Sequence, residues 1–405
     1  MPTPIKHALL SPSSAHRWLE CTPSAMLESQ EPGISSIYAE EGTEAHSLAE
    51  MKLSYMLGHI SVDEYDTRFE HFRMTSKFYN SEFNEYVNAY CQDVMTIVKD
   101  DYKGLDVKVH LEDYVTFEDI VPNGGGTSDV VIIGKDFIHI IDLKFGKGVP
   151  VSAIGNPQLR LYALGAVKKY LRECTCKETK MTIIQPRLSN ISTDFVSITE
   201  LNNWGINFVK PRAELAIAGK GELVAGDHCK FCKLKGKCQK LADKQLAIAQ
   251  AEFNDVVENN MLEPANMAPE VIAKILDIAP KFIDWFKDVE KYAANAAINN
   301  NMKIPGYKIV EGRSTRVITD TAAVIEKLHT AGFKEDDYLK PTELLGITSL
   351  EKNIGKKLFN SLCEQYIVKP VGKPTLVPES DKRPAIDVKN LRLDGSEFID
   401  IEVEE

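Results

Sequence analysis

The sequence predicts an α/β protein: a mixed sheet flanked by helices, followed by a mainly helical C-terminal region. Three observations lead to this prediction. Short Val/Ile-rich runs lie between residues 107 and 185, segments of helical periodicity flank them, and a second helical stretch begins near residue 242. The chain has 405 residues, of which 43% are hydrophobic, and this length favours two or three domains.

Composition excludes several classes of protein. Disorder requires fewer apolar residues, collagen requires a glycine period, and a membrane span requires about 18 uncharged apolar residues in a row. Because residues 1–7 lack the apolar core of a secretory signal, we expect a cytoplasmic protein with no membrane partner. The net charge of −11 disfavours nucleic-acid binding through overall charge, but residues 391–405 contribute six acids and one base. The rest of the chain can therefore still form a locally basic groove.

The first part of the chain is predicted to be helical. Ser11 and Pro12 are typical of a helix start, so we expect one helix within residues 9–30. Apolar residues at helical spacing predict further helices over residues 38–58 and 79–99.

The sheet is expected to begin with the alternating segment 107–111. The Val/Ile runs 128–134 and 137–143 are separated by a short turn, which predicts an antiparallel hairpin. An amphipathic helix should follow Pro157, and residues 180–185 should form another strand.

The C-terminal part is expected to be helical over residues 242–300. Residues 306–310 and 315–318 read as a short hairpin. Two helices should follow, near residues 320–331 and 349–366.

The hairpin carries the residues with the clearest chemistry. Asp129 starts one strand, Asp142 ends the next, and Lys144 follows on the same face as Asp142, beside the Leu143 carbonyl. Carboxylate and carbonyl oxygens suit Mg²⁺ or Mn²⁺, and a neighbouring lysine can orient a metal-bound water. The alternative interpretation is a structural Asp–Lys ion pair at a strand end.

Three further residues are candidates for the same site. Gln158 and Tyr162 are separated by four positions and therefore share one face of the helix after Pro157. His46 lies on an early predicted helix, although a lone histidine is more often an ordinary surface or core residue. Arg187 follows the strand at 180–185, where it is a weak candidate for substrate contact.

Cysteines and lysines are concentrated near residue 230. Cys229, Cys232 and Cys238 lie within ten residues, a spacing compatible with an iron-sulfur cluster or with Zn²⁺. Five lysines surround them without an intervening acid, and they form either a phosphate-contact patch or a solvated face. These lysines are Lys230, Lys233, Lys235, Lys237 and Lys240.

In their order, these motifs resemble the RecB-type PD-(D/E)XK nucleases. The matching residues are His46, Gly126–Asp129, Ile141–Lys144, and Gln158 with Tyr162. The segment from Leu10 through Trp18 to Cys21 resembles the N-terminal segment of the iron-sulfur members, which include AddB and the CRISPR adaptation nucleases. The whole chain further resembles a phage and prophage family catalogued as a domain of unknown function.

The resemblance implies a PD-(D/E)XK restriction-endonuclease-like core and a set of site roles. Asp129, Asp142, His46 and the Leu143 carbonyl would bind Mg²⁺ or Mn²⁺, and Lys144 would position the attacking water. Gln158 and Tyr162 would fix the phosphate or the lysine.

The resemblance also implies a metal staple and a DNA substrate. Cys21, Cys229, Cys232 and Cys238 would hold a 4Fe-4S cluster, with Zn²⁺ as the alternative. The expected function is a metal-dependent DNA nuclease, an exonuclease by preference, in phage recombination or DNA end processing. The rival is a DNA-binding or scaffolding module that works with a single-strand-binding or annealing protein.

These expectations divide the chain into four parts. A nuclease domain would cover residues 1–240, a helical segment 241–300, a small α+β domain 301–390 and an acidic tail 391–405. The proline-rich stretch Lys369–Pro374 should be extended and poorly packed. The sequence leaves the oligomeric state open.

Overall fold

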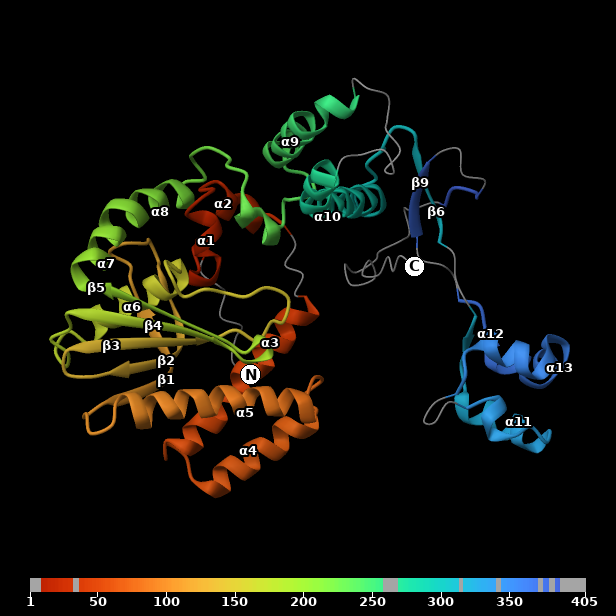
Figure 1. Ribbon diagram of the computed structural model, residues 1–405, viewed down its shortest axis with the longest axis horizontal. Coiled ribbons are helices and arrows are strands. Elements are labelled where there is room, and N and C mark those ends of the chain that lie inside the picture. The colour runs from red at the N-terminus through yellow and green to blue at the C-terminus, as the bar shows by residue number, and fades with distance from the viewer. Residues whose placement is uncertain are drawn as a thin grey trace. The chain divides into compact units, whose positions relative to one another are not determined.

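A computed structural model describes most of the chain (Figure 1). The described residues are 9–31, 36–257, 269–312, 316–339, 344–370, 374–378 and 383–386. They divide into two compact units, Met1–Ala273 and Lys274–Glu405, which we describe separately. The expected acidic tail lies outside the described residues.

The first unit is built on a five-stranded mixed sheet in the order β1-β2-β3-β4-β5. The strands are β1 (Lys108–Thr116), β2 (Gly125–Ile133), β3 (Phe137–Leu143), β4 (Glu178–Gln185) and β5 (Asn190–Ser197). β2 and β3 form the expected antiparallel hairpin, and β3 pairs with β4 in parallel. The parallel step is connected by α6 (Pro157–Lys169), as a parallel pair requires a long crossover. β5 was not predicted, because residues 190–197 are mostly polar or exposed.

Both faces of the sheet are covered, which explains the unbroken apolar runs of β2 and β3. Val131 and Ile140 contribute to a core with α6, while Val130 and Ile141 contribute to a second core on the opposite face. Helices α3 (Ile37–Met56) and α5 (Ser81–Thr96) supply that second core. Figure 1 shows α3, α4 and α5 on one side of the sheet and α1, α6, α7 and α8 on the other.

Local capping sets the starts of the helices on the α3 side. The side chains of Ser36, Ser61 and Asn80 each accept a hydrogen bond from a backbone N–H in the first turn. α4 (Val62–Thr75) was not predicted, because all of its residues are at least partly exposed and its apolar periodicity is weak.

The prediction of one helix within residues 9–30 is wrong, because the segment is divided. The segment forms a 3₁₀ turn (Pro12–Ser14), α1 (Ala15–Trp18) and α2 (Ser24–Ser29). Pro23 interrupts it, because proline disfavours the helical conformation in the residue before it. Cys21 therefore lies between α1 and α2.

The first unit continues past the sheet through helical segments. These are α7 (Ile198–Trp204), a π turn (Gly205–Val209), α8 (Lys210–Ile217), the 3₁₀ turn η5 (Asp227–Phe231) and α9 (Gln239–Val257). α10 (Pro269–Asn299) crosses the division between the units. α9 and α10 confirm the helical expectation for 242–300 within the described residues.

The second unit contains α11 (Thr321–Thr330), α12 (Ile347–Leu350), α13 (Lys356–Cys363) and two small sheets. The predicted 306–318 hairpin is wrong. β6 (Tyr307–Glu311) pairs with β9 (Pro374–Pro378), and β7 (Val317–Ile318) pairs with β8 (Ile367–Val368). Such long-range pairings leave no local turn signal. Of the stretch Lys369–Pro374, which we expected to be extended and poorly packed, residues 371–373 lie outside the described residues and Pro374 begins the paired strand β9.

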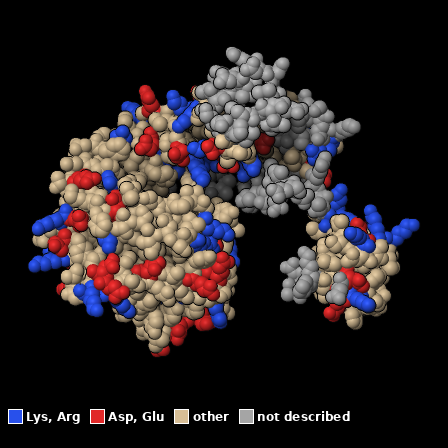
Figure 2. All heavy atoms as spheres, in the orientation of Figure 1, with Lys and Arg blue, Asp and Glu red and all other residues tan. Residues whose placement is uncertain are grey.

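Two surface properties complete the description. On the face shown in Figure 2, basic and acidic side chains are interspersed over the first unit. Among the described helices, none combines the length and apolar character that crossing a membrane requires.

Candidate metal and phosphate site

The pairing of β1 with β2 is interrupted at one level of the sheet. A single register runs from Lys108 opposite Ile133 to Thr116 opposite Gly125, and this register sets Glu112 opposite Asp129. That pair is missing from the ladder. Glu112 has a φ of 46°, in the left-handed region that residues other than glycine seldom adopt. The strand therefore deviates where the two acids meet.

The pairing of β2 with β3 ends at the same level. Its last pair is Val130 with Ile141, and one further step would set Asp129 opposite Asp142. The backbone N–H of Leu143 instead donates to Asp129 Oδ2 at 2.7 Å. Glu112, Asp129 and Asp142 thus occupy one level of three neighbouring strands, where the sheet opens.

Asp129 also contacts α3. Its Oδ1 lies 3.1 Å from Nδ1 of His46, so the structure brings this predicted residue to the site. Burial alone would lower the pKa of His46, but the Asp129 carboxylate raises it to about 9. The same contact and the Leu143 N–H lower the pKa of Asp129, against the effect of its burial.

Asp142 lies in a second network with α6. Lys144 Nζ is 2.9 Å from Asp142 Oδ2 and donates to Gln158 Oε1 at 2.8 Å. Gln158 Nε2 donates to Asp142 Oδ1 at 2.9 Å, which closes a three-residue ring. The shared face of Asp142 and Lys144 is therefore confirmed. Burial and the nearby Asp129 raise the pKa of Asp142, although Lys144 opposes them.

The start of α6 fixes the position of Gln158. Asn156 caps this helix by accepting hydrogen bonds from the backbone N–H groups of Gln158 and Leu159, and Pro157 occupies the first helical position. Tyr162, one turn later, is buried, and burial raises its pKa. The predicted shared face of Gln158 and Tyr162 is present.

Glu112 is the site residue that the sequence analysis missed. His46, Glu112 and Asp129 each place a potential ligand atom within 4.8 Å of the other two. Burial and the charge of Asp129 raise the pKa of Glu112 to about 7. The predicted strand ended at Leu111, one residue before Glu112 and five residues before the observed end at Thr116. Extending it in the register of β1 with β2 would have set Glu112 opposite Asp129.

Arg187 is engaged within the protein. Its guanidinium forms two hydrogen bonds with Glu41 on α3, at 2.9 Å and 2.5 Å, and lies 4.1 Å from the ring centre of Phe145. Its side chain is 12% exposed. These contacts connect the β4–β5 turn to α3.

The segments that carry the four predicted cluster cysteines pack together. Thr22 Oγ1 donates to the carbonyl of Lys220 at 2.7 Å, and the backbone N–H of Lys233 donates to Glu28 at 2.8 Å. Glu28 also pairs with Arg17 at 2.6 Å. The two sequence-distant segments are therefore joined by direct contacts.

The four thiols have different surroundings. Cys21 is buried, Cys229 Sγ accepts from the Gly226 N–H at 3.4 Å, and burial raises the pKa of Cys232 to about 12. In the described part of the chain, no three of these cysteines, with Cys238 included, bring their sulfurs within 4.8 Å of one another.

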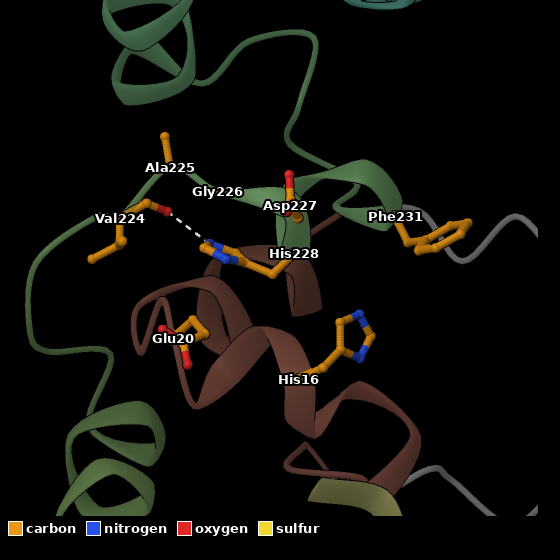
Figure 3. Close-up of a pocket in the computed structure, with 8 residues that line it drawn as sticks. All are labelled: His16, Glu20, Val224, Ala225, Gly226, Asp227, His228 and Phe231. Carbon is orange, nitrogen blue, oxygen red and sulfur yellow. Dashed lines mark hydrogen bonds between the residues drawn. The ribbon is translucent and has the colours of Figure 1, made fainter. Parts of the chain in front are cut away.

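A cavity of about 510 Å³ lies where α1 faces the segment 224–231 (Figure 3). His16 and Glu20 line it from α1 and the turn after α1, while residues 224–228 and Phe231 line it from the other side. His228 contacts the carbonyl of Val224 at 2.8 Å.

The lysines near residue 230 have different surroundings. Lys230, Lys233, Lys237 and Lys240 are exposed, and Lys235 is half-buried. Lys237 pairs with Glu31 at 2.5 Å, and Lys230 Nζ lies 5.8 Å from the ring centre of the exposed Phe231.

The fold and site define an α/β protein with a histidine–carboxylate group at the opening of a mixed sheet. The chain belongs to the family described as "Protein of unknown function (DUF2800)", whose model matches residues 7–384. The expected whole-chain resemblance to a domain of unknown function is thereby confirmed. One solved structure, described as "Crystal structure of SSO0001", is 14% identical, with 48% of this chain and 95% of that chain covered and a TM-score of 0.24.

Proposed function

We propose that this protein is a metal-dependent DNA nuclease of the RecB-like PD-(D/E)XK class. The observation that carries the proposal is the ring of Asp142, Lys144 and Gln158 next to the Asp129–His46 pair. A strand-end ion pair needs neither the glutamine from a second element nor a second buried carboxylate one strand away. The arrangement instead supplies the groups that metal-assisted phosphodiester hydrolysis requires.

The residues present fit a divalent ion. Asp129, Asp142 and the Leu143 carbonyl are hard oxygen donors, and His46 adds an imidazole. A bound Mg²⁺ or Mn²⁺ would stabilise the negative charge that develops on the phosphate. Asp142 and Asp129 are buried close together, and the raised pKa of Asp142 reflects their mutual repulsion as well as its burial. A cation between them would relieve this repulsion.

In this proposal Lys144 orients the attacking water. Its ammonium lies between Asp142 and Gln158, so the amide and the carboxylate fix its direction. Lys144 is 27% exposed, which leaves it accessible to a substrate phosphate. Gln158 is a positioning residue, because it acts through Lys144.

The iron-sulfur staple is part of the same proposal. Four thiolates are a donor set for a 4Fe-4S cluster or for Zn²⁺. The resemblance to the iron-sulfur nucleases favours the cluster, and Zn²⁺ is the alternative. Such a cluster would reinforce the contacts of Thr22 and Glu28 with residues 220 and 233.

DNA cleavage tests the proposal. The full-length protein should degrade end-labelled linear DNA in Mg²⁺ or Mn²⁺, with closed circular DNA as the comparison that separates exonuclease from endonuclease action. Asp142→Asn and Lys144→Ala should each lower the rate about 100-fold or more, because each removes one group that stabilises the transition state.

A matched control uses another Asp–Lys pair on the same unit. Lys168 on α6 contacts Asp119 at 2.8 Å on the surface. Lys168→Ala and Asp119→Asn should cleave DNA at the wild-type rate. Undiminished cleavage by Asp142→Asn and Lys144→Ala would refute the assignment. DNA binding without cleavage by the wild-type protein would favour the scaffolding alternative with a single-strand-binding or annealing partner.

A further inference from the structure

The loop between β3 and α6 lies at the edge of the proposed active site. It starts after Lys144 and ends before Gln158, and the 2.8 Å hydrogen bond between these two side chains closes its ends. Phe145 is buried, but residues 146–150 are all exposed. Exposed loops often carry the residues that contact a ligand, provided that the rest of the fold holds the loop in place.

Gln185 holds this loop in place. Its side chain is 1% exposed at the end of β4, and its Nε2 donates to the carbonyls of Gly146 at 2.7 Å and of Val149 at 3.0 Å. Its Oε1 accepts from the backbone N–H of Val151 at 3.1 Å. Asn190 adds a hydrogen bond to the Val151 carbonyl at 2.9 Å. The backbone of the exposed loop is therefore fixed by buried contacts.

The Gln185 contact also sets the direction of one backbone N–H. Because a trans peptide is planar, the N–H of Lys147 points opposite to the Gly146 carbonyl and therefore away from Gln185. The N–H groups of residues 146–149 have no hydrogen-bond partner among the described residues. Lys147 is exposed, and its ammonium forms no ion pair with any described residue. An outward N–H beside a lysine side chain can bind an anion.

The two glycines that flank Lys147 point independently to a ligand. Neither Gly146 nor Gly148 has a positive φ, and a Cβ added at either position would meet nothing within 4 Å. Conformation and packing therefore do not require glycine at these positions. Glycine also serves where a ligand approaches the backbone closely. The Cα of Gly146 lies on the same side of the peptide as the Lys147 N–H, so the missing side chain leaves this N–H open to a ligand.

We propose that Lys147 binds a backbone phosphate of the DNA through its N–H and its ammonium, and that Gln185 positions the loop for this contact. The inference rests on the proposed nuclease function for the identity of the ligand. Because the loop starts and ends at Lys144 and Gln158, the bound phosphate would be one near the scissile bond. Lys147 binds the substrate and takes no part in the hydrolysis itself.

DNA binding in Ca²⁺, which takes oxygen ligands as Mg²⁺ does, tests this proposal. The full-length protein is titrated into a fluorescently labelled linear duplex at several salt concentrations, and a gel confirms that the DNA stays intact. Lys147→Ala should raise the Kd about 10-fold and lower the salt dependence of log Kd by about one unit of slope, because one ionic contact with a phosphate is lost. Lys135→Ala is the matched control. Lys135 is also exposed and follows a glycine, but it lies at the other end of β3, so this variant should bind like the wild type.

Two further variants test the loop backbone. Gly146→Ala should weaken DNA binding several-fold while urea unfolding shows at least wild-type stability, because the fold has room for the methyl group and the bound phosphate needs that space. Gln185→Leu should also raise the Kd, and its effect should be less than additive with that of Lys147→Ala, because Gln185 acts through the loop. If Gln185→Leu does not fold, Lys147→Ala and Gly146→Ala decide the question.

The outcomes separate this proposal from the proposed function. If the wild type binds and cleaves DNA but Lys147→Ala and Lys135→Ala bind alike, the loop site is overturned and the nuclease proposal stands. A wild-type protein that neither binds nor cleaves DNA would overturn both. Exchange of chloride for inorganic phosphate at equal ionic strength should leave the Kd unchanged. A rise in the Kd that Lys147→Ala abolishes would identify free phosphate as the ligand and overturn the DNA assignment.

Discussion

Gln158 determines what Lys144 can do at the proposed active site. A lysine beside one buried aspartate would point wherever that carboxylate allows, but Gln158 accepts from Lys144 while it donates to Asp142. The amide therefore fixes the ammonium and the carboxylate relative to each other. The orientation originates in the Asn156 cap, which sets where α6 begins.

His139 is a buried titratable residue outside the proposed metal site. It is fully buried in β3, with its Nδ1 2.8 Å from the Tyr102 hydroxyl and its Nε2 2.8 Å from the Thr182 hydroxyl. Burial, reinforced by Lys180, lowers its pKa well below 6.5. The folded protein therefore keeps His139 neutral where the unfolded chain protonates it.

This difference makes stability fall as the pH drops below about 6.5, by at most about 1.4 kcal/mol per pH unit for one proton. Urea unfolding in EDTA should show that the stability difference between wild type and His139→Gln shrinks from pH 7.5 to pH 5. The comparison of two proteins cancels the opposite contribution of Glu112, which gains a proton on folding in this range. A constant difference across this range would contradict the buried neutral state.

At the scale of secondary-structure elements, the N-terminal segment depends on residues far along the chain. The Glu28 carboxylate in α2 accepts hydrogen bonds from the Arg17 side chain and from the backbone N–H of Lys233. The Thr22 hydroxyl donates to the carbonyl of Lys220. Cys21 lies between these contacts. A cluster ligated by Cys21 would add its binding free energy to the folding of this segment.

We therefore expect anaerobically purified protein to be brown, with about four irons per chain. Cys21→Ser should lose the iron, unfold at a lower temperature and expose residues 9–31 to protease. Cys176→Ser is the control, because Cys176 is half-buried two residues before β4 and is not among the proposed ligands. This variant should keep both the iron and the stability. Stoichiometric zinc in colourless protein would reject the iron assignment.

The sequence predicted the elements whose signals are local. The β2–β3 hairpin and α6 followed from apolar runs, a turn and a proline, and they were sufficient to place Asp142 beside Lys144. The β6–β9 pair was not predictable, because its strands are more than 60 residues apart and carry no mutual signal. Glu112 was missed for a similar reason: its role depends on an irregularity opposite Asp129, which only the pairing reveals.

At the scale of the whole molecule, the two units have separate hydrophobic cores. Phe359 is fully buried in a cluster with Val324, Leu328 and Tyr338 of the second unit. The residues proposed for hydrolysis all belong to the first unit. A core substitution in one unit should therefore change the stability of that unit and leave the stability of the other unit unchanged.

Phe359→Ala should destabilise the second unit by about 3–5 kcal/mol, the usual loss for a buried phenylalanine. Scanning calorimetry should show one transition moving to lower temperature while the other stays in place. Mn²⁺ binding below the first transition should be unchanged. A single transition that shifts as a whole would show that the two units unfold together.

The contacts of Thr22 and Glu28 also have a consequence during synthesis. The two partners are 198 positions apart in the first contact and 205 in the second, so the ribosome makes the N-terminal partner long before the other. At about 5–20 residues per second, the interval is roughly 10–40 seconds. The sheet residues 108–197 emerge within this interval, and the strands can pair before the N-terminal segment finds its final partners. The nascent chain thus contains the residues proposed for hydrolysis before the N-terminal segment makes its final contacts.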